Sequence, residues 1–243
     1  MRAVRLATSL WLIIVGALIL VSLLFKFPLF ATVNTQTATG IEELILIILV
    51  FELNNRYVHQ ALHFRSSLNW TKQLTIVGPS LLIVGVAAIF GLLTYTSVTP
   101  LLLTLLVAIL VSCFEELLFR GIIFKLFLRD FGSGRKSLLQ AAGLSSVYFS
   151  LTHLVNLTHQ DLMLTGLQLL FTFAIGLLLC GLYQATQSLW WPIAIHALND
   201  FFSFSQPTIN LPLIHTTAAF QLLEIVIILI LTGIVFRHTP AKN

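Results

Sequence analysis

The sequence predicts an all-α protein, a polytopic transmembrane helix bundle with about eight spans. Of the 243 residues, 58% are hydrophobic and only 9% are charged, whereas a soluble domain usually has about 25% charged residues. Apolar runs long enough to cross a bilayer recur along the chain. The net charge of +4 comes mainly from Lys and Arg between these runs. This distribution indicates membrane topology and argues against a nucleic-acid-binding surface.

The first two predicted spans lie near the N-terminus. Residues 7–25 form an apolar run without a convincing signal-peptide cleavage site, so we expect a retained first span. A polar segment over residues 32–40 follows, and residues 44–53 form a short second span. Glu42 and Glu43 open this second span. We expect both glutamates at the membrane interface, because Arg is absent four residues after the pair.

A basic loop over residues 56–72 leads to the third span, and five further spans follow it. These six spans cover residues 74–94, 101–128, 138–155, 162–183, 189–204 and 217–236. Gly132 and Gly134 break the helix after the fourth span. Trp190 and Trp191 open the seventh span, where paired tryptophans are typical interface anchors.

The distribution of Lys and Arg predicts a multi-pass protein of the cell membrane with both termini in the cytoplasm. With the N-terminus inside and eight alternating spans, the outside loops contain only Lys26. The inside segments contain Arg2, Arg5, Arg56, Arg65, Lys72, Lys125, Arg129, Arg135, Lys136, Arg237 and Lys242. This asymmetry follows the positive-inside rule.

Charged residues inside the fourth span point to a function. Glu115, Glu116 and Arg120 lie within an apolar run, although a charge at the bilayer centre costs about 2.5–3.5 kcal/mol on insertion scales. Glu116 and Arg120 are four residues apart, so they can pair on one helix face. Glu115 is turned about 100° from Glu116. It is therefore free to face another helix.

Two other spans carry histidines at depth. His153 lies in the fifth span, four residues after Phe149. In the seventh span, His196 and Asp200 share a helix face. Taken alone, His153 could be an inert histidine at a span end, and His196 with Asp200 could be a buried pair that holds two helices together. Together they match either a general-base water site or a metal site, since ionisable residues in spans normally face the bundle interior.

These residues carry a resemblance to a known family. The patterns are Glu115-Glu116-x-x-x-Arg120, Phe149-x-x-x-His153 and His196-x-x-x-Asp200. Their types and order resemble the three motifs of the CPBP (Abi) family, the CAAX-processing and bacteriocin-processing intramembrane proteases. The resemblance implies a protease core over 101–205. We expect N-terminal transmembrane helices over 1–100 and a C-terminal transmembrane helix and tail over 206–243.

The resemblance implies catalytic roles for four residues. Glu115 matches the glutamate that activates water, and His153 matches the histidine that assists it. His196 matches the histidine on the oxyanion side. Asp200 stands where the family usually has asparagine, so an oxyanion donor there requires a protonated carboxyl. Asn199 is a substitute donor, although it lies on a different helix face.

Supporting roles and a metal follow less directly from the resemblance. Glu116 and Arg120 are expected to be a structural ion pair. Zn²⁺ would suit these side chains, with Glu115, His153 and His196 as its ligands if a metal is present. The sequence has no HExxH pattern, and the family's glutamate-type mechanism needs no metal. We therefore favour water activation by Glu115, with Zn²⁺ as the alternative.

The function implied is that of a peptidase, an intramembrane endopeptidase similar to CAAX prenyl protease 2, a metalloendopeptidase by class. Its substrate would be a membrane-associated peptide, either prenylated or a peptide precursor. A non-enzymatic bacteriocin self-immunity protein that binds a peptide or membrane partner is the alternative. A transporter is a third hypothesis, but the chain shows no inverted repeat. Glu224, inside the last span, is expected to pack inward or near the interface and to lie outside the site.

Overall fold

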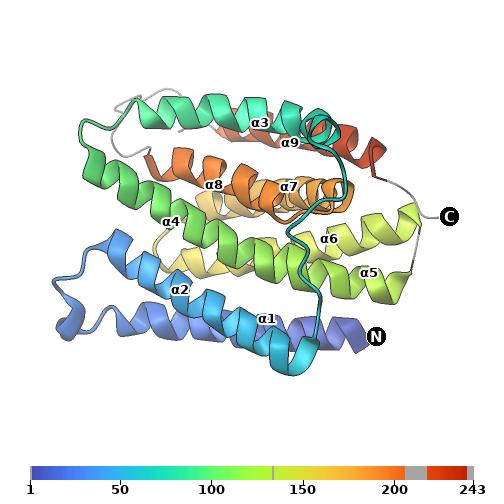
Figure 1. Cartoon of the computed structure of the whole chain (residues 1–243). Helices are drawn as coiled ribbons and strands as arrows, with labels where there is room; N and C mark the ends of the chain where they lie inside the picture. Colours follow the sequence, from blue (N-terminus) through green and yellow to red (C-terminus); the bar gives the residue numbers. More distant parts are fainter. Residues whose placement is uncertain (1, 133, 206–217, 240–243) are drawn as a thin grey trace.

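The computed structural model describes residues 2–132, 134–205 and 218–239. These residues form a bundle of helices, and no strand occurs among them. The α-helices are α1 (Arg2–Leu24), α2 (Thr35–Leu53), α3 (Trp70–Leu92), α4 (Val98–Glu116), α5 (Lys125–Phe131), α6 (Arg135–Thr152), α7 (Leu162–Thr186), α8 (Trp190–Ser205) and α9 (Ala218–Arg237). Figure 1 shows that α1 begins and α9 ends at the same end of the bundle. The all-α prediction is confirmed.

Six helical stretches in the described residues are long and apolar enough to cross a membrane. They cover residues 3–24, 70–92, 98–131, 135–158, 162–186 and 218–237. The other two predicted spans correspond to α2 and α8. Helix α2 carries three glutamates, and α8 has only 16 residues, fewer than the roughly 17–25 of a typical span.

The segment over residues 32–40, predicted to be a polar link, is largely helical. Helix α2 begins at Thr35, because the Asn34 side chain accepts a hydrogen bond from the Thr37 N–H at 2.8 Å. An asparagine at this position satisfies one of the free N–H groups of the first turn. The helix therefore begins nine residues before the predicted span. Residues 206–217, which hold most of the stretch between the seventh and eighth predicted spans, and Lys242 lie outside the described residues.

The predicted helix over 101–128 changes its hydrogen-bonding pattern directly after Glu116. Residues Leu117–Phe124 form a π-helix, and α5 continues the same chain direction. All eight residues of the π-helix are buried. Helix α4 lies between α2 and α8 (Figure 1), and it packs against both. Irregular helical segments of this kind often occur at functional sites.

A non-helical segment over 59–69 leads from the end of α2 to the start of α3 and runs across the front of the bundle in Figure 1. Hydrogen bonds fix it to the turn between α7 and α8. The Leu189 N–H donates to the His63 carbonyl at 2.9 Å, and the Ser188 hydroxyl donates to the Phe64 carbonyl at 2.6 Å. The segment therefore belongs to the folded bundle, and its two histidines lie outside any helix.

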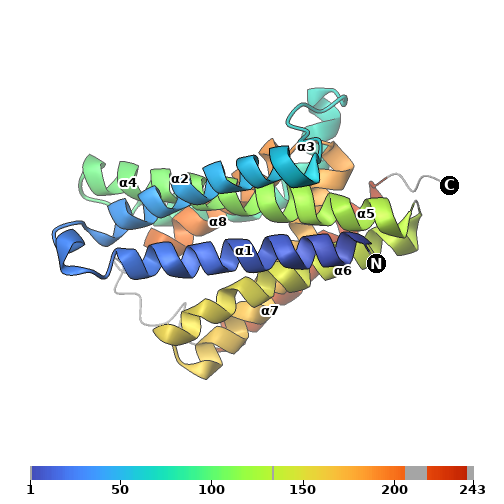
Figure 2. The same ribbon diagram turned by 90° about the horizontal axis from the view of Figure 1, so that it is seen from below.

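Helices α6 and α7 pack closely, and Figure 2 shows both on the same side of α1. Of the two, α6 lies beside α1, to which the Thr8–Tyr148 and Trp11–Thr152 hydrogen bonds join it. Gly176 of α7 makes the close approach to α6 possible. A Cβ atom at this position would lie 2.9 Å from the Cβ and Oγ atoms of Ser146. Small residues allow transmembrane helices to approach in this way. The contact fixes the end of α6, where His153 follows.

Candidate active site

The adjacent glutamates at the end of α4 face different surroundings. Glu116 is fully buried, and Glu115 is 9% exposed. The roughly 100° rotation between neighbouring helical residues directs one carboxylate into the core and the other towards a cavity. The two carboxylates can therefore have separate roles.

Glu116 contacts two nitrogen-bearing side chains in the core, those of Arg120 and His196. Its Oε1 atom accepts a hydrogen bond from Arg120 Nη1 at 2.7 Å, and lies 2.8 Å from His196 Nδ1. The Arg120 guanidinium is fully buried and lies 4.3 Å from the centre of the Phe149 ring. The ion pair that the four-residue spacing predicts is thus present. It also connects α4 to α8 through His196.

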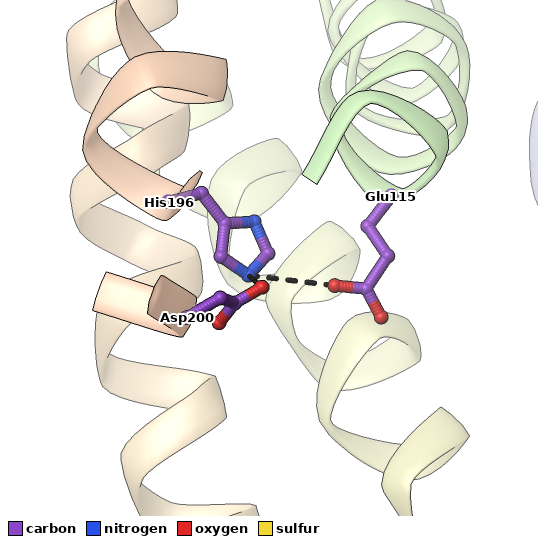
Figure 3. A group of neighbouring side chains, drawn as sticks. All are labelled: Glu115, His196 and Asp200. Atoms are coloured by element: carbon purple, nitrogen blue, oxygen red, sulfur yellow. Dashed lines mark ion pairs between the residues drawn. The ribbon is translucent and has the colours of Figure 1, made fainter. Parts of the chain in front are cut away.

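His196 connects Glu116 to the carboxylates of the cavity. Its Nε2 atom lies 3.4 Å from Glu115 Oε2 and 3.4 Å from Asp200 Oδ2. Figure 3 shows the imidazole ring between Asp200, from the same helix, and Glu115, from α4. The Ser112 hydroxyl donates to Asp200 Oδ2 at 3.4 Å. The structure therefore brings together three of the four predicted catalytic residues.

His153 lies beside this cluster, across an aromatic ring. Its ring packs edge-on against Phe149, with centroids 5.1 Å apart, and Phe149 packs in the same way against His196 at 5.7 Å. The Nδ1 atom of His153 lies 3.0 Å from the Phe149 carbonyl oxygen. When Nδ1 donates to that carbonyl, Nε2 is left as an acceptor. Among the described residues, His153 makes no ion pair with Glu115.

These groups line one cavity of about 560 Å³. This volume falls within the range of about 300–1,000 Å³ that is usual for ligand pockets. The lining includes Glu115, His153, His196, Asn199 and Asp200. The wall continues to the ends of the neighbouring helices, with Leu18, Asn156, Gln160, Leu164, Phe204, Gln221 and Glu224. All predicted catalytic residues thus face one space.

Two glutamates differ from their predicted positions. Glu43, expected at the membrane interface, is buried with 6% of its surface exposed. Glu224, expected outside the site, lies in the cavity wall. The physical reason is helix packing, since α2 packs against α4, and α9 against α7. Each is a charge in an apolar run, which is the signal that could have identified them.

The site also contains residues that the sequence patterns do not indicate. Ser112 precedes Glu115 by three residues on α4 and reaches Asp200. Gln221 precedes Glu224 by three residues on α9 and lines the cavity. Neither serine nor glutamine differs in character from the many polar residues of the chain. Only the packing of α4 against α8, and of α9 against α7, shows their positions.

The donor set fits a divalent metal ion. Glu115, His196 and Asp200 each offer one ligand atom, and these atoms lie within 4.8 Å of one another. Carboxylate and imidazole ligands suit Zn²⁺. The Glu116 contact to Nδ1 resembles the carboxylates that orient metal-bound histidines. His153, named with Glu115 and His196 as a ligand, does not belong to this group; Asp200 takes its place.

The arrangement can perform acid–base chemistry. A carboxylate at the cavity surface can take a proton from water, and a neighbouring imidazole can donate to a developing negative charge. The buried pair behind the imidazole fixes the orientation of its ring. These features satisfy the geometric requirements for hydrolysis of an acyl bond.

Comparison with known proteins supports the prediction that the chain is a peptidase. Residues 96–202 match the family model described as Rce1-like, type II CAAX prenyl endopeptidase Rce1-like. The matched segment begins just before α4 and ends within α8, so it contains every predicted site residue. Glu43, Gln221 and Glu224 lie outside it. No curated protein matches the chain.

Proposed function

We propose that this chain, whose residues 96–202 belong to the Rce1-like family of type II CAAX prenyl endopeptidases, hydrolyses a peptide bond of a membrane-associated substrate through a water activated by Glu115. The observation that carries the proposal is the cluster of Glu115, His196 and Asp200 on a cavity of about 560 Å³. The substrate class is a membrane-associated peptide, prenylated or a precursor.

In the proposed reaction, the Glu115 carboxylate takes a proton from a water molecule, and the resulting hydroxide attacks the carbonyl carbon of the scissile bond. The carbonyl oxygen becomes an oxyanion. In its protonated form the His196 ring donates from both nitrogens. Nδ1–H then donates to Glu116, and Nε2–H can stabilise the oxyanion. The Glu115 carboxylic acid finally gives its proton to the leaving amine as the C–N bond breaks.

The remaining residues assist this reaction. With its Nδ1–H donated to the Phe149 carbonyl, the His153 ring can accept a hydrogen bond from the attacking water through Nε2. Asp200 accepts a hydrogen bond from Ser112 and lies beside His196 Nε2. It is therefore better suited to stabilise the protonated imidazole by its charge than to replace the amide donor of the family pattern. Asn199 remains a donor available at the cavity surface.

A metal ion would change the chemistry of the same residues. Glu115, His196 and Asp200 would hold Zn²⁺, which would polarise the scissile carbonyl as a Lewis acid. Elemental analysis of the purified protein, with and without prior chelation, tests whether a metal is bound. A stoichiometric metal in wild type that is lost in H196A would favour this alternative over a metal-free glutamate mechanism.

The test of the proposed function replaces Glu115 with glutamine, which keeps the size of the side chain but removes the base. We expect wild type to cleave a fluorescence-quenched membrane peptide in liposomes, and E115Q to lose at least about 100-fold in kcat. The matched control is E52Q, because Glu52 is exposed on α2 outside the cavity. Thermal melts check folding.

Two results would contradict the proposal. Cleavage by folded E115Q at the wild-type rate would remove Glu115 as the base. Bacteriocin resistance in cells that is unchanged by E115Q, in a chain that cleaves no peptide, would favour a peptide-binding immunity protein instead.

A further inference from the structure

We propose that Gln221 and Glu224 of α9 recognise a basic side chain of the substrate, so that the preferred substrate is a cationic peptide. We call these two residues the α9 wall. This inference rests on the proposed function and deepens it, since it names the chemical class of substrate for the same cavity. Both residues lie outside the segment that matches the family model.

The first observation is the charge of the cavity. Its lining contains three carboxylates, those of Glu115, Asp200 and Glu224. No Lys or Arg occurs among the lining residues that the structure describes. The segment over 206–217, between α8 and α9, also contains no Lys or Arg in its sequence. A substrate with a positive charge would therefore meet three carboxylates and no Lys or Arg in the described lining, and an anionic group would be repelled.

The second observation is that acceptors of the α9 wall have no donor partner in the part of the chain that the structure describes, although the Gln221 amide also carries its own Nε2–H donors. Gln221 Oε1 is buried and has no hydrogen-bond partner in the described residues. Glu224 is half-buried, and within the same residues no hydrogen bond or ion pair to it is found. The two residues are three apart on α9, so their side chains share a helix face. Buried polar groups normally have partners. Glu224 is therefore left to accept a hydrogen bond from a bound molecule, and the ammonium of Lys or the guanidinium of Arg supplies such a donor.

The third observation is the relation of the α9 wall to the catalytic cluster. Glu224 and Glu115 line the same cavity of about 560 Å³. A side chain bound at the α9 wall therefore belongs to the part of the substrate near the scissile bond. An ionisable residue in an apolar membrane helix normally marks a functional position. The proposed hydrolysis assigns no role to Glu224. A contact with the substrate would give it one.

The experiment measures cleavage of a set of quenched peptides by full-length protein in liposomes. All peptides share one apolar core. Each carries a single Lys, Gln or Glu, and this residue is placed at successive positions before and after the core. We expect the Lys peptide to exceed the Gln peptide by about tenfold in kcat/KM at one position, as a charge-assisted hydrogen bond implies. E224Q should remove this preference through KM, with little change in kcat.

A charge reversal provides the rescue test. E224K should cleave the Glu peptide better than the Lys peptide, and the E52Q control should keep the wild-type order. Equal kcat/KM values for Lys, Gln and Glu peptides in wild type would overturn the inference while leaving the proposed hydrolysis intact. An unchanged Lys preference in folded E224Q would overturn it equally.

A binding measurement separates this inference from the proposed function. Fluorescence anisotropy compares the labelled Lys and Glu peptides on E115Q and on E115Q/E224Q in detergent, where no cleavage is needed. If E115Q binds the Lys peptide more tightly than the Glu peptide, and E115Q/E224Q does not, the result would support recognition of a basic side chain by the α9 wall. This holds even if the chain cleaves none of the peptides. Equal binding of both peptides to the two variants would refute it.

Discussion

At the scale of single residues, the site depends on a buried chain of charges that runs from Arg120 through Glu116 to His196. Arg120 and Glu116 are fully buried, so neither charge can be compensated by water if its partner is removed. The chain also explains why two adjacent glutamates are present. Glu116 holds the imidazole of His196 in place, and Glu115 is left free for the cavity.

We expect R120M to destabilise the protein by about 3–5 kcal/mol, because it leaves the Glu116 carboxylate buried without its cation. The measurement is the thermal melt of the purified variant in detergent. The matched control is R56M. Arg56 pairs with Glu52 at the same four-residue spacing but on the exposed surface, where such a pair contributes about 0–1 kcal/mol. Equal losses of stability in the two variants would contradict the buried-charge argument.

The sequence predicts the charged residues of the catalytic cluster better than the rest of the cavity wall. Spacing along one helix determines that Glu116 and Arg120 can pair. The burial of Glu43 and the place of Glu224 in the cavity wall depend instead on how α2 and α9 rotate against their neighbours. That rotation is decided by packing between segments far apart in the chain, for which a single sequence provides no spacing rule.

At the scale of elements, all predicted spans correspond to helices in the described residues, but their internal geometry was less predictable. The apolar run over 101–128 predicts a helix and gives no sign of the π-helix at Leu117–Phe124. The wider π turn comes directly after the glutamates. Its residues are buried and pack in one core with residues of several helices. The π-helix therefore reflects tertiary contacts and not a local sequence preference.

The contact between α6 and α7 gives a prediction at this scale. G176A should destabilise the protein by about 1–3 kcal/mol, because the new methyl group would overlap Ser146, whose Cα lies 3.3 Å from the Cβ position. Thermal melts in detergent measure the change. G166A, on the same helix, is the matched control, since nothing lies within 4 Å of its Cβ position. That variant should be neutral or more stable, as alanine favours helices. A G176A melt equal to that of G166A would disprove the close contact.

At the scale of the whole molecule, the start of α1 and the end of α9 lie at one end of the bundle (Figure 1). The distribution of Lys and Arg predicts that this end faces the cytoplasm. Within the described residues, the cavity wall extends to the last turns of α8 and the first turns of α7 and α9, at the other end. The geometry and the charge count together predict that the cavity faces away from the cytoplasm.

Reporter fusions to the C-terminus test this orientation in cells. A fused green fluorescent protein should fluoresce, and a fused alkaline phosphatase should be inactive, because the first requires the cytoplasm and the second an oxidising compartment. The opposite pattern would reverse the assignment and place the cavity on the cytoplasmic side. A phosphatase fusion in the loop after Lys26 serves as the control and should be active.

The segment over 59–69 has a consequence for turnover, although none of these described residues lines the cavity. Its hydrogen bonds to Leu189 and Ser188 hold the turn that leads into α8, and α8 carries His196 and Asp200. A chain cut within this segment would lose one attachment of the helix that carries two site residues. We expect limited proteolysis there to slow turnover.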